Sequence, residues 1–283
     1  MHLHFPFTVV DVLWTLTFAA HLVLLVVLLG RDRLRRFPFF TANVALVAFR
    51  LLTSKLLFGR LPQVTMLEGV ILSAVVGVVL GLLVLFELAR HAFSPSRRST
   101  WITGAIVVMA VGAAVLKFYG PWPAWEQVKS GSPFQLLQLI AQKGSLLVDV
   151  ENIAVGLLIV ALGYRFGSGW RSHTQRIVIG LSTASLGQLA IQGIWGAIAQ
   201  SASPHSMEEY NHVIALRERL FNANSALYVA VLVWWILSLW IDEPGTVRAE
   251  PPQETEIEGE GEPSALEPGS GESVEERDTS RAE

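Results

Sequence analysis

Residues 8–38 read TVVDVLWTLTFAAHLVLLVVLLGRDRLRRFP, and this stretch joins the two signals that decide the fold. Its first part, residues 8–30, holds Asp11 as the only Asp, Glu, Lys or Arg, and four arginines follow between positions 31 and 36. An apolar helix of about 20 residues crosses the hydrocarbon core of a bilayer. Arginines beside such a span favour the cytoplasmic side. The stretch therefore predicts a membrane helix that ends in the cytoplasm and is retained as an anchor, since no small-residue cleavage site follows it.

Six further apolar stretches follow along the chain, separated by segments rich in Pro, Gly, Ser or charge. With the first, they lie near 8–30, 39–59, 67–90, 101–119, 145–165, 176–199 and 219–241. The fifth and seventh helical patterns begin upstream of their spans, at about Phe134 and Met207. The sequence thus predicts an all-α, polytopic integral membrane protein, with seven transmembrane helices in residues 1–241.

The composition agrees with a membrane protein and separates a tail from the rest of the chain. Hydrophobic residues make up 52% and charged residues 16%, whereas a soluble domain carries about 25% charged residues. Residues 242–283 hold 14 acidic and 3 basic side chains, too polar a mixture to form a packed core. We expect these residues to be an acidic, disordered cytoplasmic tail. Cysteine is absent, which excludes disulfides and cysteine-bound metals.

Basic residues in the connections predict the orientation, with the N-terminus outside and the C-terminus in the cytoplasm. The alternate connections carry only Arg60, Lys117 and Lys129. The first, third and fifth connections hold ten arginines: Arg31, Arg33, Arg35, Arg36, Arg90, Arg97, Arg98, Arg165, Arg171 and Arg176. We expect a multi-pass protein of a bacterial inner membrane, with anionic lipid at these arginines.

Polar residues inside the spans are the candidate site, because ionisable groups there need a partner or a water-filled cavity. Arg50 lies about 16 Å along its helix from Phe39 and close to the midplane, so it needs a carboxylate. Asp149 or Glu151 can supply it, but not both, since they are about 200° apart on one helix. Further polar residues at mid-depth or in the outer half are Lys55, Asn152, Gln188, Gln192, Arg217, Glu218, Asn222 and Asn224. The pattern predicts an outward-facing polar cavity built by the second, fifth, sixth and seventh helices.

Two interpretations of this cluster remain open. The charges may be ion pairs that fix the helix register and bind nothing, or they may bind a small polar ligand. In the second case a non-enzymatic sensor or accessory component is favoured, and a secondary transporter is the alternative. A broken helix at mid-depth favours transport, and Gly144 is the one position that hints at it. The chain lacks GxSxG, HExxH and P-loop motifs, so we do not expect an enzyme, nor a nucleic-acid partner.

A second pattern lies before the seventh span, where His205, Glu209 and His212 share one helix face. Imidazole and carboxylate at that spacing can hold a divalent metal, and His2 and His4 are possible further ligands. A polar surface helix without metal is the favoured interpretation. The i,i+4 pair Glu87 and His91 predicts a stabilised end for the third helix.

Small residues and one ion-free span predict packing surfaces. Residues 101–116 contain no ionisable side chain and predict a wall that faces lipid. Close helix contacts, within the chain or between copies in an oligomer, are expected at Gly77, Gly81, Gly193 and Gly196.

Resemblance to known families adds no activity. Retinal-binding proteins have seven spans in this orientation, but residues 220–241 lack the lysine that a Schiff base needs, so no retinal cofactor is expected. The dipeptide Pro62–Gln63 is similar to the motif of PQ-loop transporters, yet it occurs once. FPFFTA at 37–42 and LFELARHAF at 85–93 resemble segments of uncharacterised seven-helix bacterial inner-membrane proteins. That resemblance could cover residues 5–241 and implies no ligand.

Overall fold

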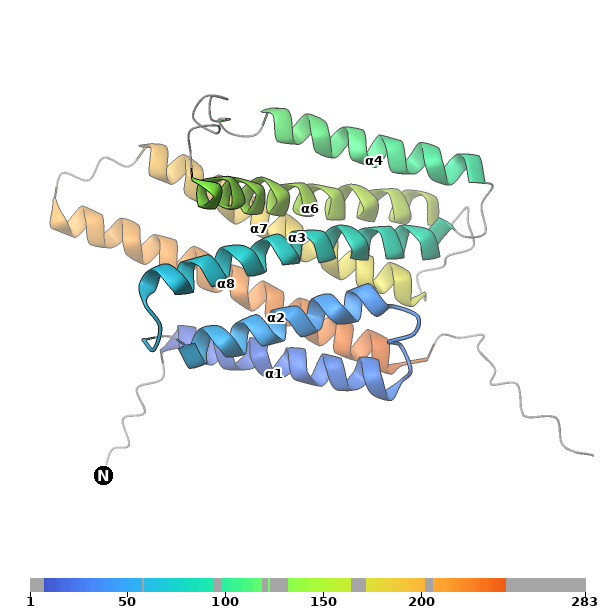
Figure 1. Ribbon diagram of the computed structural model, residues 1–283, viewed down its shortest axis with the longest axis horizontal. Helices are drawn as coiled ribbons and strands as arrows, with labels where there is room; N and C mark the ends of the chain where they lie inside the picture. The colour runs from blue at the N-terminus through green and yellow to red at the C-terminus, as the bar shows by residue number, and fades with distance from the viewer. Residues whose placement is uncertain are drawn as a thin grey trace, which may run out of the picture. The chain divides into compact units, whose positions relative to one another are not determined.

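The computed structural model describes residues 8–57, 59–93, 98–118, 122, 132–163, 172–201 and 206–242. These residues form seven α-helices (Figure 1). They are α1 (Val9–Gly30), α2 (Pro38–Leu57), α3 (Gln63–Phe93), α4 (Arg98–Phe118), α6 (Pro133–Gly163), α7 (His173–Ser201) and α8 (Met207–Trp240). The predicted all-α class is confirmed, and α6 and α8 begin upstream of their spans as expected. The acidic tail lies outside the described residues, apart from Asp242.

The helices begin where the local sequence favours a start. Thr8 and Ser206 cap α1 and α8, because their hydroxyl oxygens accept from the backbone N–H groups of Asp11 and Glu209. Pro38 and Pro133 open α2 and α6, at a position where the missing N–H costs nothing. Each of these starts therefore has a residue in the local sequence that favours it.

The described helices have the length and surface of membrane spans. All of them except α4 are long and apolar enough to cross a bilayer, and α4 contributes the shorter apolar segment Ile106–Phe118. Large apolar side chains are exposed around the bundle, for example Val26 at 66% and Leu157 at 68%. Such a surface is costly in water and suits contact with lipid chains. The chain is a multi-pass helical membrane protein.

Six of the helices follow one another around a closed ring. Contacts join α1 to α2, α2 to α3, α3 to α6, α6 to α7, α7 to α8 and α8 back to α1. The remaining described helix, α4, packs on α6 outside the ring, as Figure 1 shows. This peripheral place agrees with the wall predicted for residues 101–116, with one exception at Gly112 described below.

One end of the ring, which we call the arginine end, holds the described arginines Arg31, Arg33, Arg90 and Arg176. There Arg31 and Arg33 pair with Asp242 after α8, at 3.2 and 2.9 Å. At the same end, Arg176 at the start of α7 donates to the carbonyl oxygen of Ser238 at 2.9 Å. These contacts bring the end of α1, the start of α7 and the end of α8 together. Which side of the membrane holds the arginine end stays a prediction.

The hydrophobic core fills the half of the ring near the arginine end. Phe40 of α2 and Trp235 of α8 meet edge to face at 5.2 Å, on the side of the core that faces away from the arginine end. Trp235 can approach α7 closely because position 180 is glycine, and any Cβ there would overlap the indole ring. The core includes Leu24, Leu28, Phe37, Leu88, Ile159, Ile177, Leu232 and Leu239. Apolar side chains therefore fill the interior of this half of the ring.

Two of the glycines singled out in the sequence serve packing within the chain. A Cβ at Gly81 would meet Val148 at 2.9 Å, and one at Gly144 would meet Val78 at 2.7 Å, so both bring α3 and α6 together. Nothing lies within 4 Å of such an atom at Gly77, Gly193 or Gly196. Helix α6 continues unbroken through Gly144. The hint of a broken transport helix at this position was wrong, because the glycine allows close packing instead.

Candidate functional site

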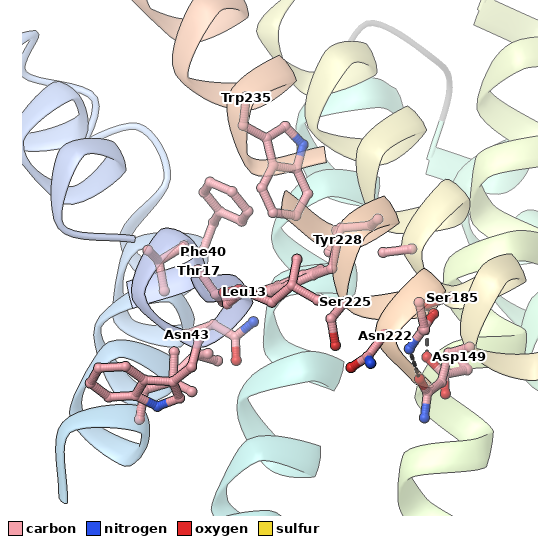
Figure 2. A pocket seen from close by; sticks show the side chains of 18 of the residues that line it. Leu13, Thr17, Phe40, Asn43, Asp149, Ser185, Asn222, Ser225, Tyr228 and Trp235 are labelled. Atoms are coloured by element: carbon pink, nitrogen blue, oxygen red, sulfur yellow. Dashed lines mark hydrogen bonds between the residues drawn. The ribbon is translucent and has the colours of Figure 1, made fainter. Parts of the chain in front are cut away.

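A cavity of about 530 Å³ lies beyond Phe40 and Trp235, on the side away from the arginine end. Five ring helices line it: α1, α2, α6, α7 and α8. Figure 2 shows Trp235 and Phe40 at its upper part and Asn43, Asn222 and Asp149 lower down. Four of these helices, α2, α6, α7 and α8, are those that the sequence indicated, and the outward opening of the cavity stays a prediction. Helix α1 also contributes, through Val10, Leu13, Trp14 and Thr17.

Asp149 is held at the cavity wall by a chain of hydrogen bonds between α6 and α7. The hydroxyl of Ser185 donates to Oδ1 of Asp149 at 2.8 Å, and the side-chain amide of Asn152 donates to Oγ of Ser185 at 2.9 Å. One turn away, Ser182 donates to the carbonyl oxygen of Asn152 at 2.7 Å. A serine that accepts one bond and donates another fixes the direction of the whole chain. Asp149 therefore has a defined orientation before any ligand arrives.

Two more polar pairs position the wall formed by α8. Asn224 donates to Oε1 of Gln188 on α7 at 2.5 Å. The imidazole of His21 is fully buried, with Nδ1 2.7 Å from the carbonyl oxygen of Thr17 and Nε2 3.1 Å from the hydroxyl of Tyr228. Since a carbonyl oxygen only accepts, Nδ1 carries the proton and the phenol of Tyr228 donates to Nε2. His21 therefore anchors Tyr228 at the cavity wall.

Several polar groups in the cavity wall have no hydrogen-bond partner among the described residues. Oδ2 of Asp149 accepts no hydrogen bond from the described residues. The side-chain amides of Asn43 and Asn222 likewise make none with the part of the chain that the structure describes. Unpaired polar groups in a membrane protein are costly unless water or a ligand meets them. These groups therefore need water or a ligand as a hydrogen-bond partner.

Lys55 pairs with a residue outside the predicted cluster. Its Nζ pairs with Oδ1 of Asp11 at 3.0 Å and lies 5.3 Å from the ring centroid of Trp14. Both partners belong to the start of α1, so Lys55 joins α1 to α2 at the end of the ring opposite the arginine end. Its place in the predicted ligand cluster stays a prediction, since α1 already supplies it with a carboxylate.

Arg50 does not form the expected ion pair. Within the described residues, neither Asp149 nor Glu151 lies within 4.0 Å of its guanidinium, and its side chain is exposed. The described group that it influences electrostatically is the phenol of Tyr228. The predicted pairing does not form, because the side chain of Arg50 is exposed on α2. Of the two oxygens of Asp149, Oδ1 accepts from Ser185 of α7. Arg50 is also absent from the lining of the cavity.

Glu151 faces away from the cavity. It is only 1% exposed, and neither carboxylate oxygen has a hydrogen-bond partner among the described residues. Position 112 of α4 is glycine, and a Cβ there would overlap Oε1 of Glu151. The two carboxylates of α6 therefore serve opposite faces, as their spacing predicted. The ion-free α4, however, covers a buried carboxyl rather than forming a plain lipid wall.

The remaining predicted residues spread over two places. The guanidinium of Arg217 lies 5.4 Å from the ring of Trp195 and 5.5 Å from that of Phe221, while Glu218 is exposed. Gln192 lines a second cavity of about 510 Å³, between α3, α6 and α7, and Gln188 lines both cavities. Asp149, Gln188, Asn222 and Asn224 are thus the predicted residues that the central cavity brings together. Asn152 is bonded to Ser185, the partner of Asp149.

The metal pattern stays a prediction. His2, His4 and His205 lie outside the described residues. Among those that are described, no three His, Asp or Glu side chains could hold a metal ion together. Glu209 has a clear local role through its backbone, since its N–H donates to the capping hydroxyl of Ser206 at 3.2 Å.

The sequence interpretation missed several neutral cavity residues: Thr17, Asn43, Ser185, Ser225 and Tyr228. A signal was available for one of them. Ser185, Gln188 and Gln192 are spaced three and four residues apart, which places them on one face of α7. The others are isolated polar residues in apolar stretches, and isolated residues carry no periodicity.

Comparison with known proteins gives no family for this chain. No protein-family model, curated protein or solved structure matches it.

Proposed function

We propose that the chain is a sensor or accessory component that recognises a small polar ligand in its central cavity, without chemistry on that ligand. The observation that carries the proposal is the set of unpaired groups in the wall: Oδ2 of Asp149 and the amides of Asn43 and Asn222. At about 530 Å³, the cavity falls within the range of small-molecule sites. We also propose a bacterial inner membrane as its location, with the arginine end in the cytoplasm.

The lining indicates which ligands to try. Asp149 is the only carboxylate in the lining, and the described lining residues include no Lys or Arg. A ligand that donates to Asp149, through an ammonium or hydroxyl group, is therefore favoured over an anion. Trp14, Phe40 and Trp235 add aromatic surface, which suits the apolar part of such a ligand or attracts a cation.

A thermal-shift screen of detergent-purified protein tests this function. The panel contains amino acids, small amines, polyols and sugars. For the compound that stabilises the protein, Asp149→Asn should weaken binding by roughly 10–100-fold, since hydrogen bonds to charged groups are worth about 1.5–3 kcal/mol. Glu151→Gln is the matched control, because it neutralises a carboxylate two residues away that faces α4. Equal loss in both variants, or no compound that stabilises the protein, would contradict ligand recognition by the cavity.

A secondary transporter is the alternative, and one observation favours it. Gln188 lines both the central cavity and the second cavity, so the two are neighbours along one possible path. The packed core at the arginine end argues for a closed site. Uptake of the stabilising compound into proteoliposomes decides between them. Accumulation that Asp149→Asn abolishes would replace the sensor with a transporter, and binding without uptake would retain the sensor.

A further inference from the structure

A separate cavity of about 440 Å³ lies at the arginine end, between the start of α2 and the end of α3. Three arginines contribute to its lining: Arg35 and Arg36 from the turn after α1, and Arg90 from α3. His91, in the same lining, packs its ring 5.3 Å from that of Phe37. The cavity is remote from Asp149 and plays no part in the proposed function.

The one carboxylate in this cavity is already occupied. Glu87 is 4% exposed, and its two oxygens accept from the backbone N–H groups of Phe39 and Phe40, at 3.2 and 3.0 Å. Arg90 forms no ion pair with any described residue. Among the described residues Arg35 pairs only with Asp32, at 3.7 Å with both side chains well exposed, and such pairs are weak. No described carboxylate therefore occupies the guanidinium of Arg90, and that of Arg35 is held only weakly.

The rest of the lining indicates what carries that anion. Phe39 and Phe86 line the same cavity and are 37% and 51% exposed. Both belong to helices apolar enough to span the membrane, so their exposed rings meet lipid chains. Cations beside exposed rings match a molecule with an anionic head and an apolar tail. Arginine binds phosphate oxygens through parallel N–H donors, and basic pockets between membrane helices suit phospholipid headgroups.

We propose that this cavity binds the phosphate headgroup of an anionic phospholipid, with an acyl chain lying against Phe39 and Phe86. Arg35 and Arg90 hold the phosphate, and Glu87 keeps the start of α2 in place behind it. The site is a built cavity rather than a general attraction of basic connections to an anionic surface. It is expected to hold one lipid in a fixed position.

Native mass spectrometry of the full chain in detergent tests the proposal. The protein is titrated with phosphatidylglycerol, with phosphatidylcholine, and with soluble glycerol phosphate. We expect one phosphatidylglycerol to bind in preference to phosphatidylcholine. Arg90→Gln should weaken this binding about fivefold, from about 1 kcal/mol for an arginine near the membrane surface. Arg90→Lys should retain most of it.

Arg31→Gln is the matched control, since Arg31 lies at the same end but pairs with Asp242 and stacks on Trp240. Equal weakening by Arg31→Gln and Arg90→Gln would show diffuse attraction and overturn the site. So would equal binding of both lipids, or full competition by glycerol phosphate at the lipid's own concentration, because a soluble phosphate has no chain for Phe39 and Phe86. If Arg90→Gln does not fold, the exposed Arg35→Gln provides the same comparison.

Discussion

At the scale of single residues, Glu151 and Asp149 show how two carboxylates on one helix have different surroundings. Glu151 is buried against Gly112 of α4 with no hydrogen-bond partner in the described part of the chain. Asp149, two residues earlier, has Ser185 on one oxygen and the cavity beside the other. The same helix thus buries one carboxyl against α4 and presents the other to the cavity.

Substitution of Gly112 tests the contact with Glu151. We expect Gly112→Ala to lower the free energy of unfolding by about 1–3 kcal/mol, because the added methyl overlaps the carboxyl of Glu151 and overpacks the interface. The double variant Gly112→Ala, Glu151→Ala should lose less than the sum of the two single changes. Chemical denaturation in detergent measures all three variants. Gly77→Ala is the control, since its methyl meets nothing within 4 Å; an equal effect there would rule out the contact.

At the scale of elements, α2 is fastened by a residue of another helix. The spacing of Glu87 and His91 predicted a pair within α3. In the structure, the carboxylate of Glu87 instead accepts from the first N–H groups of α2. Nδ1 of His91 lies 2.8 Å from the backbone oxygen of Glu87. A carboxylate at a helix N-terminus also interacts favourably with the helix dipole. The start of α2 is therefore held in place by a side chain of α3.

Removing this cap should weaken the bundle. Glu87→Ala leaves two N–H groups without an acceptor, and that of Phe40 belongs to a residue only 1% exposed. We expect a loss of about 1–3 kcal/mol in the free energy of unfolding, and a smaller loss for Glu87→Gln, which keeps one oxygen. Thermal unfolding followed by circular dichroism measures the difference. Glu68→Ala, an exposed carboxylate at the other end of α3, should change stability by less than about 0.5 kcal/mol; a loss as large as that of Glu87→Ala would contradict the capping role.

At the scale of the whole molecule, the described helices pack a hydrophobic core near the arginine end and leave the central cavity beyond it. The arginine end combines this core with the cavity of about 440 Å³ and the pairs to Asp242. The opposite half holds Asp149 and the unpaired amides. If the arginines face the cytoplasm, the cavity belongs to the outer half of the membrane.

The lack of cysteine allows a direct test of this orientation. Leu34 and Leu61 lie in the turns after α1 and α2 and are 40% and 39% exposed, so they are a matched pair. We expect a membrane-impermeant maleimide to label Leu61→Cys on intact cells and to label Leu34→Cys only after permeabilisation. Labelling in the reverse order would invert the topology. The wild-type chain, with no cysteine, is the blank.

The spans could be predicted from sequence because lipid contact demands long apolar runs, and those are visible one helix at a time. The surroundings of Arg50 and Lys55 could not be predicted in the same way. Which side chains meet depends on the rotation and register of neighbouring helices, and no pattern within α2 states that Lys55 reaches Asp11 of α1. Helix α1 was also missed as a cavity wall, because its polar residues Thr17 and His21 are few and far apart. Asp149 was found because a carboxylate inside a span is rare.

The closure of the ring between α1 and α8 has a consequence for biosynthesis. His21 is buried in the finished protein with its hydrogen bond to Tyr228, which follows it by 207 residues. At roughly 5–20 residues per second, ribosomes need about 10–40 s to cover that interval. During this time α1 is in the membrane, and the imidazole of His21 lacks its partner because Tyr228 has not yet been synthesised. The nascent chain is open on that side until α8 arrives, and translation stalled before Tyr228 leaves the gap to lipids, chaperones or proteases.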